Sequence, residues 1–167
     1  MADNPFAGLP HRPSHIAEWE DLLVRYELGP RAVRHAVEEV EGDESAAASG
    51  SWRVADHLAH LAEREAEAGA WLQALQQGQE LKPWAAAEAH RGASRTEPTS
   101  DLERYTVHRN RNFARVQRRG VDVWEWESSH ALFGAVTAFQ LLSYQVRHDG
   151  RHLARIREIR RADARPC

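Results

Sequence analysis

The chain has 167 residues, which is enough for one domain with its own hydrophobic core. Its 22 Lys and Arg are outnumbered by 25 Asp and Glu, and this near balance argues against nucleic acid as a partner. Cys167 is the only cysteine and cannot form an internal disulfide, and the sequence contains neither a membrane-spanning apolar run nor a secretory signal pattern. We therefore expect a cytoplasmic protein that does not bind membranes.

The first predicted helix covers residues 14–40. Ser14 is a good helix-capping residue, and apolar side chains recur at helical spacing after it. Gly29-Pro30 is a position at which this helix could kink, because proline has no backbone N–H to donate.

The second predicted helix covers residues 52–77, after an acidic linker rich in small residues at 41–51. Ser51 is the expected N-cap of this helix. One face carries a regular stripe of mostly apolar side chains, namely Val54, Leu58, Leu61, Glu65, Ala68, Leu72 and Leu75. This face is predicted to pack into a core.

A long connection at 78–99, which contains glycines and prolines, precedes a third helix at 100–119. Ser100 and Glu103 form a predicted capping box at its start. The segment that follows shows no convincing alternation of apolar and polar residues, so no strand is expected there. Thr137 and Gln140 form another predicted capping box.

This second box opens a fourth helix that extends to about residue 160. Four amphipathic helices predict an all-α fold, a four-helix bundle with one long crossover connection. The expected organisation is an N-terminal extension at 1–13, the bundle domain at 14–160 and a flexible tail at 161–167.

His148 and His152 lie on the apolar stripe of the fourth helix, four residues apart. Side chains at this spacing are stacked one turn apart, so both imidazoles could reach one metal ion. The alternative is a pair of core histidines satisfied by hydrogen bonds. The second helix offers His57 and His60 as a third ligand, and the helical wheel narrowly favours His57, which lies nearer the centre of its stripe.

Three stretches resemble the DinB-like (DinB/YfiT-type) superfamily of metal-binding four-helix bundles. They are YELGPR at residues 26–31, WRVADHLAHLAERE at 52–65 and the closing segment at 133–156, which contains HDGRHL. The resemblance implies a metal triad of His60, His148 and His152, so His60 ranks above His57. Two residues depart from the family pattern: Arg53 replaces the usual Ser or Thr, and His57 replaces an apolar residue, leaving open a fourth ligand or a ligand swap.

Three imidazoles leave a coordination position for water or substrate, as catalytic metal sites do. Zinc is the expected divalent ion, with nickel, iron or manganese as alternatives. The resemblance implies a thiol-dependent S-transferase or a hydrolase that acts on a small molecule, with a low-molecular-weight thiol as cosubstrate and a homodimer as the assembly. The alternative is a non-catalytic, stress-related metal-binding or scaffold bundle.

Other polar and aromatic residues are assigned from chemistry alone. Glu65 could accept a hydrogen bond from His60, because metal-bound imidazoles usually donate their second N–H. Asp56 and Asp149 are expected to be surface or interface acids. Surface or loop positions are expected for six histidines: His11, His15, His35, His90, His108 and His130. The tryptophans Trp71, Trp84, Trp124 and Trp126 either pack in the core or line a pocket or subunit interface.

Overall fold

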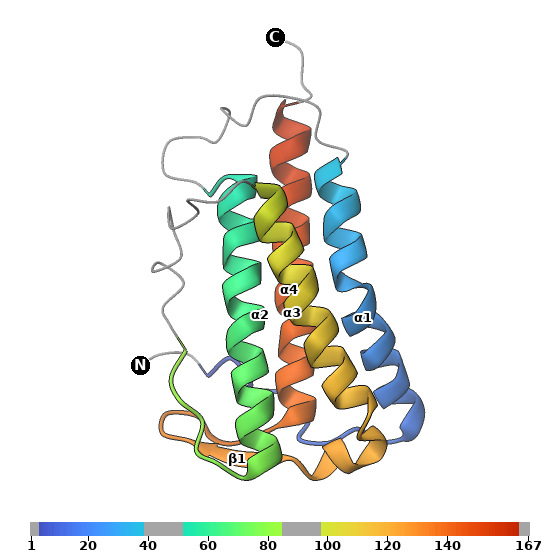
Figure 1. Cartoon of the computed structure of the whole chain (residues 1–167), viewed down its shortest axis with the longest axis vertical. Helices are drawn as coiled ribbons and strands as arrows, with labels where there is room; N and C mark the ends of the chain where they lie inside the picture. The colour runs from blue at the N-terminus through green and yellow to red at the C-terminus, as the bar shows by residue number, and fades with distance from the viewer. Residues whose placement is uncertain (1–3, 39–51, 85–97, 164–167) are drawn as a thin grey trace.

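The computed structural model describes residues 4–38, 52–84 and 98–163 (Figure 1). The helices within these ranges are α1 (Ile16–Glu38), α2 (Val54–Gln77), α3 (Pro98–Gln117) and α4 (Ala138–Asp163). A 3-10 helix, η3 (Gly120–Glu125), and two strands, β1 (Glu127–His130) and β2 (Gly134–Thr137), lie between α3 and α4. No helix in the described part of the chain is long and apolar enough to cross a membrane.

The four helices form a bundle in which α1 and α2 each pack against both α3 and α4. Figure 1 shows α1 and α2 on opposite sides, with α2 and α3 running in the same direction. A short turn cannot join two parallel neighbouring helices, which explains the long segment between Gln77 and Pro98. The predicted all-α four-helix bundle with one long crossover is confirmed.

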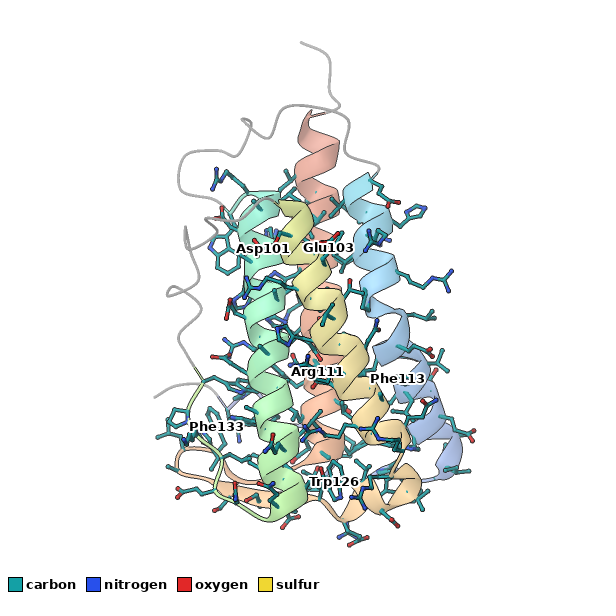
Figure 2. The ribbon with its side chains drawn as sticks, in the orientation of Figure 1. Asp101, Glu103, Arg111, Phe113, Trp126 and Phe133 are labelled. Atoms are coloured by element: carbon teal, nitrogen blue, oxygen red, sulfur yellow. The ribbon has the colours of Figure 1, made fainter. Side chains whose placement is uncertain are left out.

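The segment after η3 forms a β-hairpin, so the expectation of no strand was wrong. β1 and β2 pair antiparallel from Glu127 opposite Thr137 to His130 opposite Gly134. Each strand has only four residues, too few to produce a recognisable alternation. The backbone N–H of Leu81 donates to the carbonyl of Ser129 at 2.9 Å, which joins the connection after α2 to the hairpin. Figure 2 shows Trp126 and Phe133 at this end of the bundle.

Two helix starts differ from the predicted caps. α1 begins at Ile16, and the ring Nδ1 of His15, rather than Ser14, accepts the backbone N–H of Glu18 at 3.2 Å. α3 begins at Pro98, so Ser100 lies inside its first turn instead of capping it. Proline suits the first helical position because its missing N–H has no partner there in any case.

At the remaining two helix starts, an acidic or amide side chain accepts a hydrogen bond from a backbone N–H group. At α2 the backbone N–H of Arg53 donates to Asp56 at 2.9 Å, and the predicted cap Ser51 lies outside the described residues. At α4 the predicted capping box is confirmed. The backbone N–H of Thr137 donates to the Gln140 side chain, and the backbone N–H of Gln140 donates to the Thr137 hydroxyl, both at 3.2 Å.

The core at the hairpin end of the bundle is rich in aromatic rings. Phe6, which precedes α1, is buried, and its ring lies 5.9 Å from that of Trp71. Trp71 stacks on Trp84 at 4.3 Å. All four tryptophans considered above belong to this cluster or pack against it: Trp71, Trp84, Trp124 and Trp126. Core packing is therefore their role in this structure.

A buried polar cluster ties all four helices together at mid-height. Arg109 on α3 is fully buried, and its Nη2 donates to Glu65 of α2 at 2.8 Å and to Asp149 of α4 at 2.7 Å. Its Nη1 donates at 2.8 Å to the backbone carbonyl of Tyr26 in α1. Pro30 has no N–H to occupy that carbonyl, so the proline in α1 creates the acceptor that Arg109 uses.

Candidate metal centre

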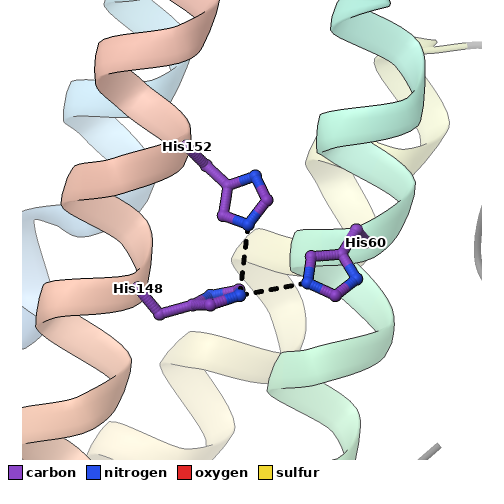
Figure 3. A group of neighbouring side chains, drawn as sticks. All are labelled: His60, His148 and His152. Carbon is purple, nitrogen blue, oxygen red and sulfur yellow. Dashed lines mark hydrogen bonds between the residues drawn. The ribbon is translucent and has the colours of Figure 1, made fainter. Parts of the chain in front are cut away.

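Three histidines from two helices point their rings toward one another (Figure 3). His148 and His152 extend from successive turns of α4, and His60 faces them from α2. His148 and His60 are buried, whereas His152 is partly exposed. One ring nitrogen from each histidine belongs to a group whose members all lie within 4.8 Å of one another.

The distances between these nitrogens suit a common metal ion. Nε2 of His148 lies 3.0 Å from Nε2 of His60 and 3.1 Å from Nε2 of His152. Bonds of about 2.0–2.1 Å to one tetrahedral zinc ion would separate two ligand nitrogens by roughly 3.3 Å. Small ring movements would bring the three atoms to that spacing. The group could therefore hold a divalent metal ion.

His57 lies beside this group and contacts the outer ring nitrogen of His152. Its Nδ1 is 2.8 Å from Nδ1 of His152, the ring nitrogen that does not face His148. When Nε2 of His152 is a free lone pair, Nδ1 carries the proton and donates it to His57. This geometry makes His57 a hydrogen-bond partner that orients His152. The helical wheel favoured His57 by its depth within the stripe, a criterion that does not include the direction of the ring.

Burial keeps two imidazoles of this group, those of His148 and His152, neutral. The pKa of His148 is lowered far below its usual value, mainly by burial and then by the neighbouring His152 and His60. Burial, followed by the neighbouring His57, lowers the pKa of His152 to about 3. Burial also lowers the pKa of His57. Metal binding needs unprotonated imidazole, so these ligand atoms are available at neutral pH.

The histidines line a pocket of about 600 Å³ between α2 and α4. Trp52, just before α2, forms part of the wall, and its ring lies 5.1 Å from that of His60 and 5.8 Å from that of His152. The other polar and aromatic lining residues are Arg64, Tyr144, Arg151, Arg155 and Glu158. Sequence reasoning did not identify these five as pocket residues. The spacing of Tyr144 and Arg151 from His148, by one helical turn, could have indicated two of them.

Three acids assigned from chemistry lie elsewhere than expected. Glu65 does not support His60 as predicted, because its carboxylate accepts hydrogen bonds from Tyr26, Arg109 and Asn112. Asp149 is only 7% exposed and Asp56 only 6%, so neither is a surface acid. Asp149 binds Arg109, a contact between two helices that the sequence does not reveal. Asp56 caps α2, and this role depends on a helix start that the sequence analysis placed differently.

The outcome for the six remaining histidines is mixed. His130 was predicted to be at the surface but is 3% exposed, and its ring stacks on Phe133 at 4.3 Å. The β-hairpin, which was not predicted, creates this buried position. His11, His15 and His35 are exposed, His108 is half-buried, and His90 lies outside the described residues.

Among protein families, curated proteins and solved structures, only the solved structures gave a match to this chain. No protein-family model matches it, and no curated protein matches it. A solved structure of YfiT from Bacillus subtilis superimposes with a TM-score of 0.80 and 19% sequence identity, covering 94% of each chain. That protein is described as a probable metal-dependent hydrolase with an unusual four-helix bundle topology. The chain thus has the YfiT-like bundle fold, and the DinB/YfiT-type resemblance seen in the sequence is confirmed at the level of fold.

Proposed function

We propose that this chain is a divalent-metal-dependent enzyme that acts on a small molecule. The observation that carries the proposal is the convergence of three imidazole nitrogens, from His60, His148 and His152, in a pocket of about 600 Å³. Three protein ligands leave a coordination position open, which distinguishes a catalytic site from a closed structural one. The similarity of the fold to that of YfiT, described as a probable metal-dependent hydrolase, also supports the proposal.

Zinc is the ion that the donor set favours, because imidazole nitrogens at this spacing match its tetrahedral bonds. A divalent ion in such a site acts as a Lewis acid that lowers the pKa of water or of a thiol. Hydrolysis and transfer to a low-molecular-weight thiol would share this activation step. The chain has no internal cysteine nucleophile, since Cys167 is its only cysteine, so any reacting thiol would come from a cosubstrate.

The protein residues have separate tasks in this proposal. His57 holds the ring of His152 through its Nδ1, so that Nε2 of His152 faces the other two nitrogens. Trp52 packs against the rings of His60 and His152 and limits the access of water on that side. Tyr144 and Arg151 line the same pocket and would contact a bound substrate.

The test combines metal analysis with a search for turnover. Purified protein should contain about one zinc per chain after reconstitution, and His60→Ala and His148→Ala should lose it. His11→Ala, which changes an exposed histidine outside the pocket, is the matched control. Ester and amide panels, each with and without added thiols, then separate hydrolysis from thiol transfer.

Absence of metal from the reconstituted wild-type protein would contradict the proposal. Stoichiometric metal without turnover on any panel would favour the alternative, a non-catalytic metal-binding bundle. Turnover that survives in His148→Ala would show that another site performs the reaction.

A further inference from the structure

The charges around the pocket of the candidate metal centre are not balanced. Three arginines line it, and two of them have carboxylate partners. Arg64 pairs with Glu67 at 2.9 Å, and Arg155 pairs with Glu158 at 2.6 Å. Arg151 forms no ion pair with any carboxylate in the described parts of the chain. Its guanidinium lies beside Tyr144, 5.9 Å from the ring centroid.

Arg151 is also close to the histidines. It lies on α4 between His148 and His152, one helical turn after His148, and its side chain lines the same pocket. Its positive charge contributes to the lowered pKa of both histidines, after the larger effect of burial and of neighbouring imidazoles. The unbalanced cation therefore acts on the space in which a substrate would sit.

The pocket as a whole would attract an anion. Burial lowers the pKa of His57, His148 and His152, and the one lining carboxylate, Glu158, is neutralised by Arg155. Arg151 thus adds a positive charge that no carboxylate among the described residues offsets, and a divalent ion would add two more. Trp52 and Tyr144 add apolar walls of low polarisability, beside which these charges attract an anion more strongly than in open solvent.

The anion that fits best is a carboxylate. The planar guanidinium of arginine forms two parallel hydrogen bonds with a carboxylate, whose single charge equals that of the one unbalanced arginine. In the metal-free protein a phosphate dianion would need a second unpaired cation, and Arg64 and Arg155 are both paired with carboxylates. The aromatic walls favour a flat apolar body attached to the charged group.

We propose that the substrate is a small, flat monocarboxylate whose carboxylate binds Arg151 while its body lies between Trp52 and Tyr144. This inference rests on the proposed function, because it names the substrate class of the same site. The pocket volume of about 600 Å³ is in the range of pockets that bind small organic molecules.

Benzoate is the probe, and its binding to zinc-loaded and metal-free protein can be measured by calorimetry. Both forms should bind benzoate, and Arg151→Gln should weaken binding by about tenfold or more, as expected for loss of a charge-assisted hydrogen bond. Arg157→Gln is the matched control, since Arg157 is exposed on α4 and does not line the pocket. Benzamide, which has the same shape but no charge, should bind at least tenfold more weakly than benzoate.

Equal benzoate affinity in wild type and Arg151→Gln would overturn the inference, as would equal affinity for benzamide and benzoate. Tighter binding of phenyl phosphate than of benzoate would overturn the assignment to carboxylates. Absence of benzoate binding by either form would also overturn it. The measurement on metal-free protein separates this inference from the proposed function. If the protein took up no metal but still bound benzoate through Arg151, the carboxylate site would be supported and the proposed metal-dependent function would be contradicted.

Discussion

Two buried polar clusters lie side by side in this bundle, and they are built in opposite ways. In the Arg109 cluster a cation is surrounded by the carboxylates of Glu65 and Asp149, which also accept hydrogen bonds from other side chains. In the histidine cluster like groups face one another, with Nε2 of His148 about 3 Å from two further ring nitrogens. In the first cluster, both terminal nitrogens of the Arg109 guanidinium donate to oxygen acceptors. The second collects lone pairs that only a proton or a metal ion can share.

The sequence places these clusters next to each other, because Asp149 directly follows His148. Asp149 faces Arg109 on α3, and His148 faces His60 on α2. The ion pair therefore fixes the rotation of α4 about its axis, and that rotation directs the histidines toward α2. The Arg109 cluster is thus placed to stabilise the fold and the histidine cluster could hold a ligand, and substitutions can separate the two roles.

The largest expected effect comes from Arg109→Met. This change removes the cation and leaves Glu65 and Asp149 buried without it, and breaking a buried ion pair in this way costs about 3–5 kcal/mol. Urea unfolding should show this loss in the free energy of unfolding. Arg111→Met, at an exposed site on the same helix, should change it by less than about 0.5 kcal/mol. Equal effects of the two changes would show that the cluster does not stabilise the fold.

The next effect tests how closely α1 approaches this cluster. A Cβ at Gly29 would lie 2.7 Å from Nη1 of Arg109 and 3.0 Å from both Asp149 and Tyr105, so Gly29→Ala should lower the free energy of unfolding by about 1–3 kcal/mol. Gly150→Ala is the matched control within α4, because nothing lies within 4 Å of the added atom. It should stabilise the protein by about 0.5–1 kcal/mol, the usual gain of alanine over glycine in a helix. Destabilisation of similar size at both positions would contradict the steric explanation.

The sequence revealed the part of this architecture that depends on periodicity. The apolar stripes of α2 and α4 and the Thr137–Gln140 capping box follow from local spacing, and all three predicted their elements well. The hairpin at 127–137 did not follow, because strands of four residues carry too little pattern and pair through tertiary contacts.

The two clusters also differ in how far local sequence spacing predicts them. Histidines four apart on one helix are visible in the sequence, so His148 and His152 could be identified before their partner. The Arg109 cluster joins residues that no local spacing relates, and the sequence offered Gly29-Pro30 only as a possible kink. The role of these two residues is visible only in the structure. Gly29 leaves room for the guanidinium of Arg109, and Pro30 leaves the carbonyl of Tyr26 available to accept its hydrogen bond.

A smaller effect is expected for His57→Ala. This change removes the partner of Nδ1 of His152 and lets that ring rotate, and loss of such a supporting hydrogen bond lowers metal affinity by about 10- to 100-fold. Competition with a chromophoric chelator measures the zinc affinity directly. His11→Ala should leave it unchanged. If His57→Ala instead abolished zinc binding as completely as His148→Ala, His57 would be a ligand and not a partner of His152.

The smallest effect should appear in the metal-free protein under mild acid. The pKa of His152 is lowered to about 3 in the folded state by burial and by His57, whereas an unfolded chain takes up this proton near pH 6.5. Between these values the unfolded state binds more protons, so the free energy of unfolding must fall as pH falls below about 6.5. Urea unfolding at pH 7.0 and 5.5 measures this slope, which His152→Ala should reduce and His11→Ala should not. Zinc should oppose the loss, because it binds only neutral imidazoles and so stabilises the folded state in which they are held together. A slope that is unchanged in His152→Ala would mean that the folded state does not lower the pKa of His152.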